Sequence, residues 1–279
     1  MTRRNWISTA ALGALPVIGY PTLFEPRWLE LTSTRVKLAK WRSKESVRIL
    51  HLADFHASFA VPPSLIDRAI EIGIQQQPDL ACLTGDFITF KGGFNTKFYE
   101  QSLAKLARVL PTYAVLGNHD GGKWAPARGG FADHTLVEKI LEGSGVKLMH
   151  NKSEVRRFGN QDLVIAGVGD LWSEEIHAEA AFEDRDGELP TILLSHNPDS
   201  KAYVANFPWD LMLCGHTHGG QVIIPFEGPR YAPVQDKQFV AGLKNWRDRQ
   251  IYITRGVGNL GSVRFRCRPE ITVLDIAEI

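Results

Sequence analysis

The sequence predicts an α/β domain, and two observations lead to this prediction. From Val47 onward, short apolar runs alternate with segments in which apolar residues recur at helical spacing. Five of the apolar runs end just before Asp, Asn or His residues, at the position where α/β sheets bind their ligands. The 279 residues are 44% hydrophobic and 23% charged, which is an ordinary globular composition and enough chain for one large domain.

Residues 1–45 are predicted to be a signal or anchor followed by a membrane-proximal segment. Arg3 and Arg4 precede a mostly apolar run from Ile7 to Tyr20, which resembles a twin-arginine export signal. The alternative is a basic terminus without a targeting role. No A-x-A cleavage site follows, which favours a leader that stays attached. We therefore expect the protein in the periplasm or on the periplasmic face of the inner membrane, with a cytoplasmic, membrane-associated protein as the alternative.

Between Phe24 and Arg42, aromatic and aliphatic residues alternate with Arg and Lys. This composition suits a membrane surface, because aromatic rings and basic side chains both favour the headgroup layer. It suits equally a segment that packs on the flank of the domain, and the sequence does not decide between the two. The net charge of +1 offers no general attraction to polyanions. We expect no nucleic-acid partner, and we expect a monomer.

Residues 46–279 are predicted to form the folded domain. The first half alternates strands with helices that carry apolar residues on one face. Strands are expected at 47–53, 80–84 and 112–116, and helices at 64–77, 99–110 and 135–143. The second half contains more strand, at 163–168, 191–194, 211–214, 251–254 and 271–276. The glycine-rich, aromatic stretch from Gly121 to Asp133 is expected to be a surface loop.

Residues with metal-binding side chains follow five of these strands. They are Asp54 and His56, Asp86, Asn118 with His119 and Asp120, His196, and His216 with His218. Ligands delivered at the carboxyl ends of separate strands would converge in space. The D-x-H and H-x-H spacings put both members of a pair on the same side of the backbone. Gly85, Gly117 and Gly215 precede such residues, where a tight turn leaves little room for a side chain.

This residue set suits the hydrolysis of a phosphate ester. Two cations about 3.5–4 Å apart neutralise the phosphate, hold the attacking and leaving oxygens, and generate hydroxide near neutral pH. Carboxylate, amide and imidazole ligands suit manganese, iron or zinc, and we expect two divalent ions, with manganese favoured. The chain has no CxxC pair, so a thiolate zinc site is not expected. Its three cysteines are predicted to be buried thiols rather than a disulfide framework.

Five blocks in this order resemble the motif series of the calcineurin-like metallophosphoesterases. The blocks are Asp54-Phe55-His56, Gly85-Asp86, Gly117-Asn118-His119-Asp120, His196 and Gly215-His216-Thr217-His218. The resemblance implies a four-layer α/β/β/α sandwich of two mixed sheets flanked by helices. It also implies that Asp86 bridges two metals. Asp54, His56 and His218 would complete one site, and Asn118, His196 and His216 the other. His119 would act as a proton donor to the leaving oxygen, and we expect Asp120 to orient it.

A narrower resemblance concerns one bacterial subgroup of exported or membrane-associated phosphodiesterases. It rests on the leader, on His196-Asn197-Pro198-Asp199-Ser200, on the stretch from Gly215 to Gln221, and on Thr254-Arg255-Gly256-Val257-Gly258. We therefore expect a phosphodiesterase with a metal-bridging hydroxide as nucleophile, acting on a phosphate ester, with a lipid-linked ester as one option. The alternative is a UDP-2,3-diacylglucosamine pyrophosphatase of lipid A synthesis. A scaffold without catalysis is disfavoured, because degenerate members would lose ligands or the proton donor and all are present here.

Some residues near these blocks have no assigned role. Arg255 follows a predicted strand, where it could hold a phosphate or form a structural ion pair. Gly219, Gly220 and Gln221 could let the backbone approach the substrate or could simply form a turn. His51 lies inside a predicted strand and is expected to be a core residue, whereas His134, His150 and His177 fit no motif.

Overall fold

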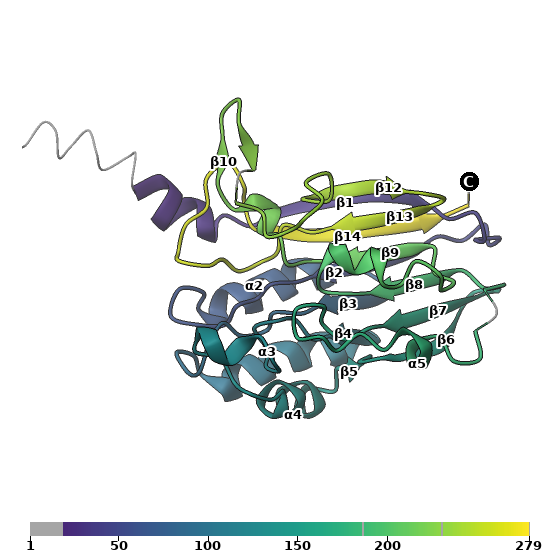
Figure 1. Cartoon of the computed structure of the whole chain (residues 1–279), viewed down its shortest axis with the longest axis horizontal. Coiled ribbons are helices and arrows are strands. Elements are labelled where there is room, and N and C mark those ends of the chain that lie inside the picture. The colour runs from purple at the N-terminus through teal and green to yellow at the C-terminus, as the bar shows by residue number, and fades with distance from the viewer. Residues whose placement is uncertain (1–18, 186, 230, 279) are drawn as a thin grey trace, which may run out of the picture.

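The computed structural model describes residues 19–185, 187–229 and 231–278, and its architecture is a pair of stacked sheets (Figure 1). Each large sheet has six strands. Helices cover the outer face of the first sheet, and the two inner faces pack against each other. The twin-arginine-like motif at Arg3 and Arg4 lies outside the described residues.

The first sheet has the strand order β1-β14-β2-β3-β4-β5. These strands span Glu30–Lys37, Glu270–Ala277, Val47–Leu52, Leu80–Thr84, Thr112–Val115 and Lys147–Leu148, respectively. Strands β2 to β5 run parallel, whereas β14 is antiparallel to β2 and parallel to β1. The carboxyl ends of β2, β3 and β4 therefore lie side by side at one edge of the sheet.

Three amphipathic helices cover the outer face of this sheet: α2 (Pro63–Ile74), α3 (Thr96–Val109) and α4 (Thr135–Ser144). Pro63 provides a fixed φ at the start of α2. The side chain of Asn95 caps α3 by accepting a hydrogen bond from the N–H of Phe98, and Gly145 ends α4 in the left-handed conformation. These helices fix the loops that carry the site residues of the first sheet.

The second sheet has the strand order β12-β13-β9-β8-β7-β6. These strands span Gly242–Trp246, Arg249–Ile253, Leu211–Cys214, Thr191–Leu194, Gln161–Gly167 and Lys152–Phe158. The four inner strands β13, β9, β8 and β7 run parallel, and the edge strands β12 and β6 are antiparallel to their neighbours. Strands β8 and β9 are entirely buried, which explains their continuous apolar sequences.

The predicted four-layer sandwich is confirmed, with unequal outer layers. Side chains from both sheets form the middle core, among them Ile49 and Tyr113 from the first and Ile165 and Leu213 from the second. Among the described residues, the outer face of the second sheet is covered by the short helix α5 (Ala178–Ala181), the 3-10 helix η4 (Pro198–Ala202) and the loops around them. The three cysteines are free and buried, as predicted.

The segment before residue 46 needs a correction. Strand β1 was not predicted, yet it pairs along its whole length with β14, and Val36, Leu38 and Trp41 are buried in the middle core. The predicted boundary after residue 45 therefore falls inside the folded unit, and this part of the segment packs on the domain. The short helices η1 (Tyr20–Phe24) and η2 (Glu25–Arg27) precede the sheet. Within the described residues, no helix is both long and apolar enough to span a bilayer.

Candidate metal centre

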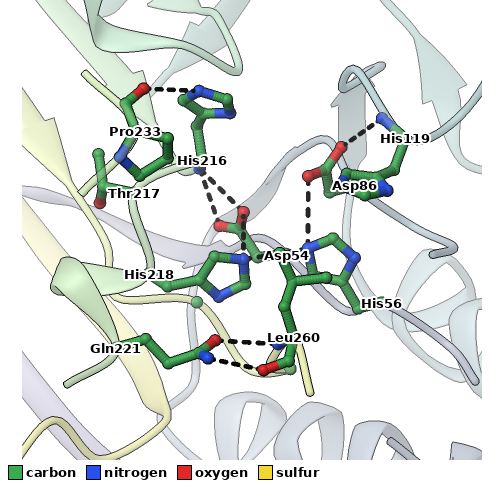
Figure 2. Close-up of polar contacts among 12 residues, drawn as sticks. Asp54, His56, Asp86, His119, His216, Thr217, His218, Gln221, Pro233 and Leu260 are labelled. Carbon is green, nitrogen blue, oxygen red and sulfur yellow. Dashed lines mark hydrogen bonds and ion pairs between the residues drawn. The ribbon is translucent and has the colours of Figure 1, made fainter. Parts of the chain in front are cut away.

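The candidate residues lie at the carboxyl ends of strands from both sheets. Those from the first sheet follow β2, β3 and β4, and those from the second follow β8 and β9. Figure 2 shows Asp54, His56 and His218 close together, with Asp86 beside His56 and the backbone nitrogen of His216 facing Asp54. Of the nine candidate residues named in the sequence analysis, all except the half-buried His119 are buried. We call the set without Asp120 the floor; it comprises Asp54, His56, Asp86, Asn118, His119, His196, His216 and His218.

Potential ligand atoms of the floor form three groups, each with its atoms within 4.8 Å of one another. The groups are Asp54, His56 and His218; His56, Asp86 and His119; and Asp86, His196 and His216. Asp86 Oδ2 lies 3.3 Å from His56 Nε2 and 3.2 Å from His196 Nε2. The carboxylate of Asp86 thus stands between the two outer groups, which is the arrangement a bridging ligand requires.

The hydrogen bonds of the imidazole rings show that these residues fit cations. His196 donates its Nδ1–H to the carbonyl of Thr84 at 2.8 Å, and His216 donates its Nε2–H to the carbonyl of Pro233 at 3.0 Å. Because a carbonyl can only accept, the remaining ring nitrogens, His216 Nδ1 and His196 Nε2, present lone pairs to each other at 3.1 Å. Two lone pairs at that distance require a proton or a cation between them.

A second pair of rings and an amide support the same conclusion. His56 Nε2 lies 3.0 Å from His218 Nε2, beside the carboxylate of Asp54. The amide oxygen of Asn118 is buried and accepts no hydrogen bond from the described residues. A buried acceptor without a donor is uncommon in folded proteins and indicates a missing partner. These nitrogen and oxygen donors match the preferences of borderline divalent cations.

The backbone of the floor is held in an unusual conformation. Five of its non-glycine residues have positive φ angles: Asp54 (52°), His56 (48°), Asp86 (55°), His216 (70°) and His218 (50°). Each such residue costs on the order of 1–3 kcal/mol, which the surrounding structure must offset. Backbone donors do part of this, because the N–H of His216 binds Asp54 at 2.9 Å and the N–H of His119 binds Asp86 at 2.9 Å.

The positions before the site residues require glycine for the predicted steric reason, because a larger side chain would not fit. A Cβ on Gly117 would lie 2.3 Å from Asp86 Oδ1, and one on Gly215 would lie 2.3 Å from Asp54 Oδ2. A Cβ on Gly85 would meet the backbone of Gly117 at 2.6 Å. The carboxylates therefore occupy the space that any larger residue would need.

The expectation that Asp120 orients His119 is wrong. The Asp120 carboxylate accepts hydrogen bonds from the backbone N–H groups of Phe87 (2.7 Å), Ile88 (3.2 Å) and Gly117 (2.8 Å). The ring of His119 donates instead from Nδ1 to the carbonyl of Thr89 at 2.9 Å. Asp120 turns away from the ring because three backbone donors compete for it. Its role is to tie together the loops after β3 and β4.

The charges of the floor are strongly coupled. Burial raises the pKa of Asp54 to about 7. Burial alone would also raise the pKa of Asp86, but the neighbouring imidazoles of His196 and His119 hold it well below its usual range. Burial lowers the pKa of His56 to about 3, whereas the carboxylate of Asp86 overcomes the burial of His196 and raises its pKa to about 10. Positive charge is therefore favoured between Asp86 and Asp54.

A cavity of about 460 Å³ opens above the floor. The ring of Trp172 lies edge-on to His216 with centroids 4.3 Å apart, and Trp124 lies 4.8 Å from His119. The two indoles are 5.4 Å apart, and the guanidinium of Arg128 stacks on Trp124 at 3.9 Å. We call the side chains around the opening the walls; they are Trp124, Arg128, Trp172, Tyr231, Pro233 and Leu260.

Sequence reasoning missed Asp170 and Trp172, although the sequence carried a signal for Asp170. Strand β7 is a sixth strand that ends near an acidic residue, Asp170, and this pattern went unused. Asp170 is buried, burial raises its pKa to about 6, and its Oδ2 accepts a hydrogen bond from the N–H of Ser173 at 2.7 Å. This turn places Trp172 against His216.

Four further residues, Arg255, His51, Gly219 and Gly220, have structural roles. Arg255 forms ion pairs with Glu30 at 2.7 Å and with Glu270 at 3.1 Å, so the structural alternative holds. His51 is buried and its Nε2 lies 2.8 Å from the hydroxyl of Thr84, as expected for a core residue. Gly219 and Gly220 form the turn η5 (His218–Gly220).

Comparisons with known proteins agree with this geometry. Residues 47–220 match the family model described as calcineurin-like phosphoesterase. The chain is 40% identical to phosphodiesterase YaeI of Escherichia coli K12, with 99% of each chain covered. It is 28% identical to the metallophosphoesterase YkuE of Bacillus subtilis, covering 99% of this chain and 98% of that one. It is 26% identical to UDP-2,3-diacylglucosamine pyrophosphatase LpxG of Chlamydia muridarum, with 96% of each covered.

The match to the family model spans more than half of the chain and includes every residue of the floor. Phosphodiesterase YaeI is similar to this chain over nearly the full length of both proteins. The chain therefore belongs to the calcineurin-like phosphoesterase family and is a hydrolase of phosphate esters.

Proposed function

We propose that this enzyme is a phosphodiesterase that depends on two divalent cations held by the floor. The observation that supports this most is the position of Asp86, whose Oδ2 lies within 3.3 Å of ligand nitrogens on both sides. A single carboxylate between two groups of ligands suits a pair of cations rather than one. The 40% identity to a protein named phosphodiesterase supports the choice of diester over monoester.

The floor residues would divide between the two cations as follows. Asp54, His56 and His218 would hold one, and Asn118, His196 and His216 would hold the other, with Asp86 shared. When bound, the cations supply neutralisation of the phosphate charge and activation of water. Manganese is our first choice, with iron and zinc as alternatives, because the ligand groups contain nitrogen and oxygen donors and no thiolate.

His119 would protonate the leaving oxygen. Its Nδ1–H is engaged by the carbonyl of Thr89, so its Nε2 is the nitrogen that remains for the substrate. His119 is the only half-buried residue among the eight of the floor, and it borders the cavity. A proton donor must reach the ester oxygen directly, and this position allows it.

The walls favour a diester with an apolar or planar substituent. Two indole rings and Leu260 present mostly apolar surface, and the guanidinium of Arg128 can meet a negative charge at the opening. Apolar walls are also the observation that favours the second candidate, a UDP-2,3-diacylglucosamine pyrophosphatase, whose substrate carries acyl chains. In both cases the bond cleaved is at phosphorus.

A membrane-adjacent location is part of the proposal. Leu23, Phe24 and Trp28, which precede the first sheet, are more than half exposed. Exposed aromatic and aliphatic side chains after a leader with paired arginines suit a protein exported by the twin-arginine route and held near the inner membrane as a monomer. Fusing residues 1–45 to a reporter tests the route: changing Arg3 and Arg4 to Lys should abolish translocation, and unchanged translocation would reject it.

Hydrolysis assays test the main proposal. Manganese-loaded protein should hydrolyse bis(p-nitrophenyl) phosphate faster than p-nitrophenyl phosphate, and a chelator should abolish the activity. Titration of metal-free protein with Mn²⁺ should give two ions per chain. One ion per chain, or activity that survives chelation, would contradict the two-cation proposal. Preferential release of UMP from UDP-2,3-diacylglucosamine would favour the second candidate.

A further inference from the structure

Arg264 is a fully buried arginine that the proposed mechanism does not use. Its exposed fraction is 0%, and it forms no ion pair with a carboxylate of the described residues. Burying an unpaired charge is costly, so its neighbours must satisfy the guanidinium in another way. Such a residue calls for a specific explanation.

The guanidinium binds backbone carbonyls on two sides. On one side, Nε donates to Gly258 at 3.1 Å, and Nη2 donates to Arg255 at 2.8 Å and to Gly256 at 3.1 Å. On the other side, Nη1 donates to Cys267 at 3.0 Å and makes a longer contact to His218 at 3.5 Å. The rigid five-donor fork of arginine can link both sides at once, which an ammonium group cannot.

Each side contacts one member of the same ligand group, Asp54 on one side and His218 on the other. The N–H of Gly258 donates to the carbonyl of Asp54 at 2.7 Å, and a Cβ on Gly256 would lie 2.6 Å from the Asp54 Cβ. On the other side, the thiol of Cys267 lies 3.2 Å from the carbonyl of His218. Arg264 thus connects the backbone around Asp54 with the backbone of His218.

The chain before the first sheet supports the same loop from outside. The carbonyl of Pro21 accepts a hydrogen bond from the N–H of Arg264 at 2.8 Å. The carboxylate of Glu25, which is fully buried, accepts one from the N–H of Cys267 at 2.5 Å. The helices η1 and η2 therefore hold the loop that carries Arg264. In Figure 1 they form the purple helical segment beside the yellow loop.

We propose that Arg264 is a positioning residue that fixes Asp54 and His218 relative to each other, with Glu25 supporting it. The inference rests on the proposed function, because it concerns the affinity of one of the two cation sites. Residues that orient ligands typically change metal affinity by about 10–100-fold when they are replaced. None of the carbonyls that Arg264 binds belongs to the other site, which is formed by Asn118, His196 and His216 with the shared Asp86.

The test is calorimetric titration of the metal-free full-length chain with Mn²⁺. Arg264→Lys keeps the charge but cannot bind both sides, so one of the two affinities should fall about tenfold or more and the other should stay near wild type. Excess Mn²⁺ should restore turnover, which a simple loss of folding would not permit. Arg266→Lys is the matched control, because Arg266 is exposed and lies two residues along the same loop.

If both Mn²⁺ affinities of a folded Arg264→Lys protein match those of the wild type, the inference is overturned while the proposed function stays intact. Failure of the wild-type chain to bind two ions would reject the proposed function itself. If Arg264→Lys does not fold, Glu25→Ala takes its place, because it removes only the acceptor for Cys267. That variant should lower the same affinity by severalfold, and unchanged binding in it would also overturn the inference.

Discussion

The floor and the walls of the cavity are built in opposite ways. All floor side chains except the half-buried His119 are buried, the Asp54 and Asp86 carboxylates accept hydrogen bonds from backbone N–H groups, and five floor residues have left-handed backbone conformations. Wall side chains such as Trp124, Arg128 and Tyr231 are partly or largely exposed, and Trp124 packs against both Arg128 and Trp172. The difference indicates that the floor is preorganised for one reaction, whereas the walls can change with the substrate at little cost to the fold.

Replacing the shared carboxylate should produce the largest effect. Asp86→Asn removes a negative charge that both ligand groups face, so turnover should fall by about a thousandfold with every ester tested. Metal analysis after dialysis should show fewer than two ions per chain. Asp67→Asn, which alters a carboxylate paired with Lys105 on the outer helices, is the control and should retain full activity. Retention of two tightly bound ions in Asp86→Asn would remove the bridging role.

Removing the proton donor should cost less and leave the metals in place. His119→Ala should lower kcat by about a hundredfold or more, because general acid catalysis contributes about 10²–10⁴-fold. Asn118→Ala, which removes a proposed ligand of one cation, should lower kcat by a similar factor. His177→Ala, which changes an exposed histidine away from the cavity, should behave as wild type. Wild-type kcat in His119→Ala would reject its assignment.

A wall residue should change selectivity rather than chemistry. Trp172→Ala removes the indole that lies against His216, and aromatic contacts of this kind contribute about 0.5–1.5 kcal/mol. We expect kcat/KM for bis(p-nitrophenyl) phosphate to fall up to about tenfold, with a much smaller change for methyl p-nitrophenyl phosphate. An equal loss with both esters would place Trp172 with the floor and erase the distinction.

The smallest effect should come from the helical layer far from the cavity. Lys105 pairs with Asp67 and Glu71 between α2 and α3, with nearly half of its side chain exposed. Solvent screens surface pairs of this kind, so Lys105→Ala should lower the free energy of unfolding only slightly and leave kcat unchanged. Denaturant unfolding measures it, and a loss of activity would contradict the separation.

The sequence predicted the floor far better than the walls. Asp54, Asp86 and His216 each follow a short apolar strand, so their convergence followed from the geometry of parallel sheets. Trp172 carries no comparable signal, because its place depends on a turn closed by the hydrogen bond between Asp170 and Ser173. The prediction for Asp120 was wrong because three backbone N–H groups bind its carboxylate in place of the adjacent imidazole. The sequence does not show where those groups lie.

Two further elements escaped prediction for physical reasons. Strand β1 reads as the mixed polar sequence from Glu30 to Lys37, since an edge strand buries only part of its side chains. Its partner β14 lies more than two hundred residues later, so no local sequence pattern predicts the pairing. Arg264 was overlooked because its partners are carbonyl groups, which every residue has. By contrast, the long helices and inner strands followed from periodicity and uninterrupted apolar runs.

The hydrogen bond from Arg264 to the carbonyl of Pro21, together with the one from Cys267 to Glu25, has a consequence for maturation. A peptidase that removed the first residues would have to cut on the N-terminal side of Pro21 to preserve both bonds. A cut only a few residues later would release η1 and η2 and loosen the loop behind Asp54 and His218. The position of the mature N-terminus, read by mass spectrometry of the native protein, is thus tied to whether the enzyme retains its metals.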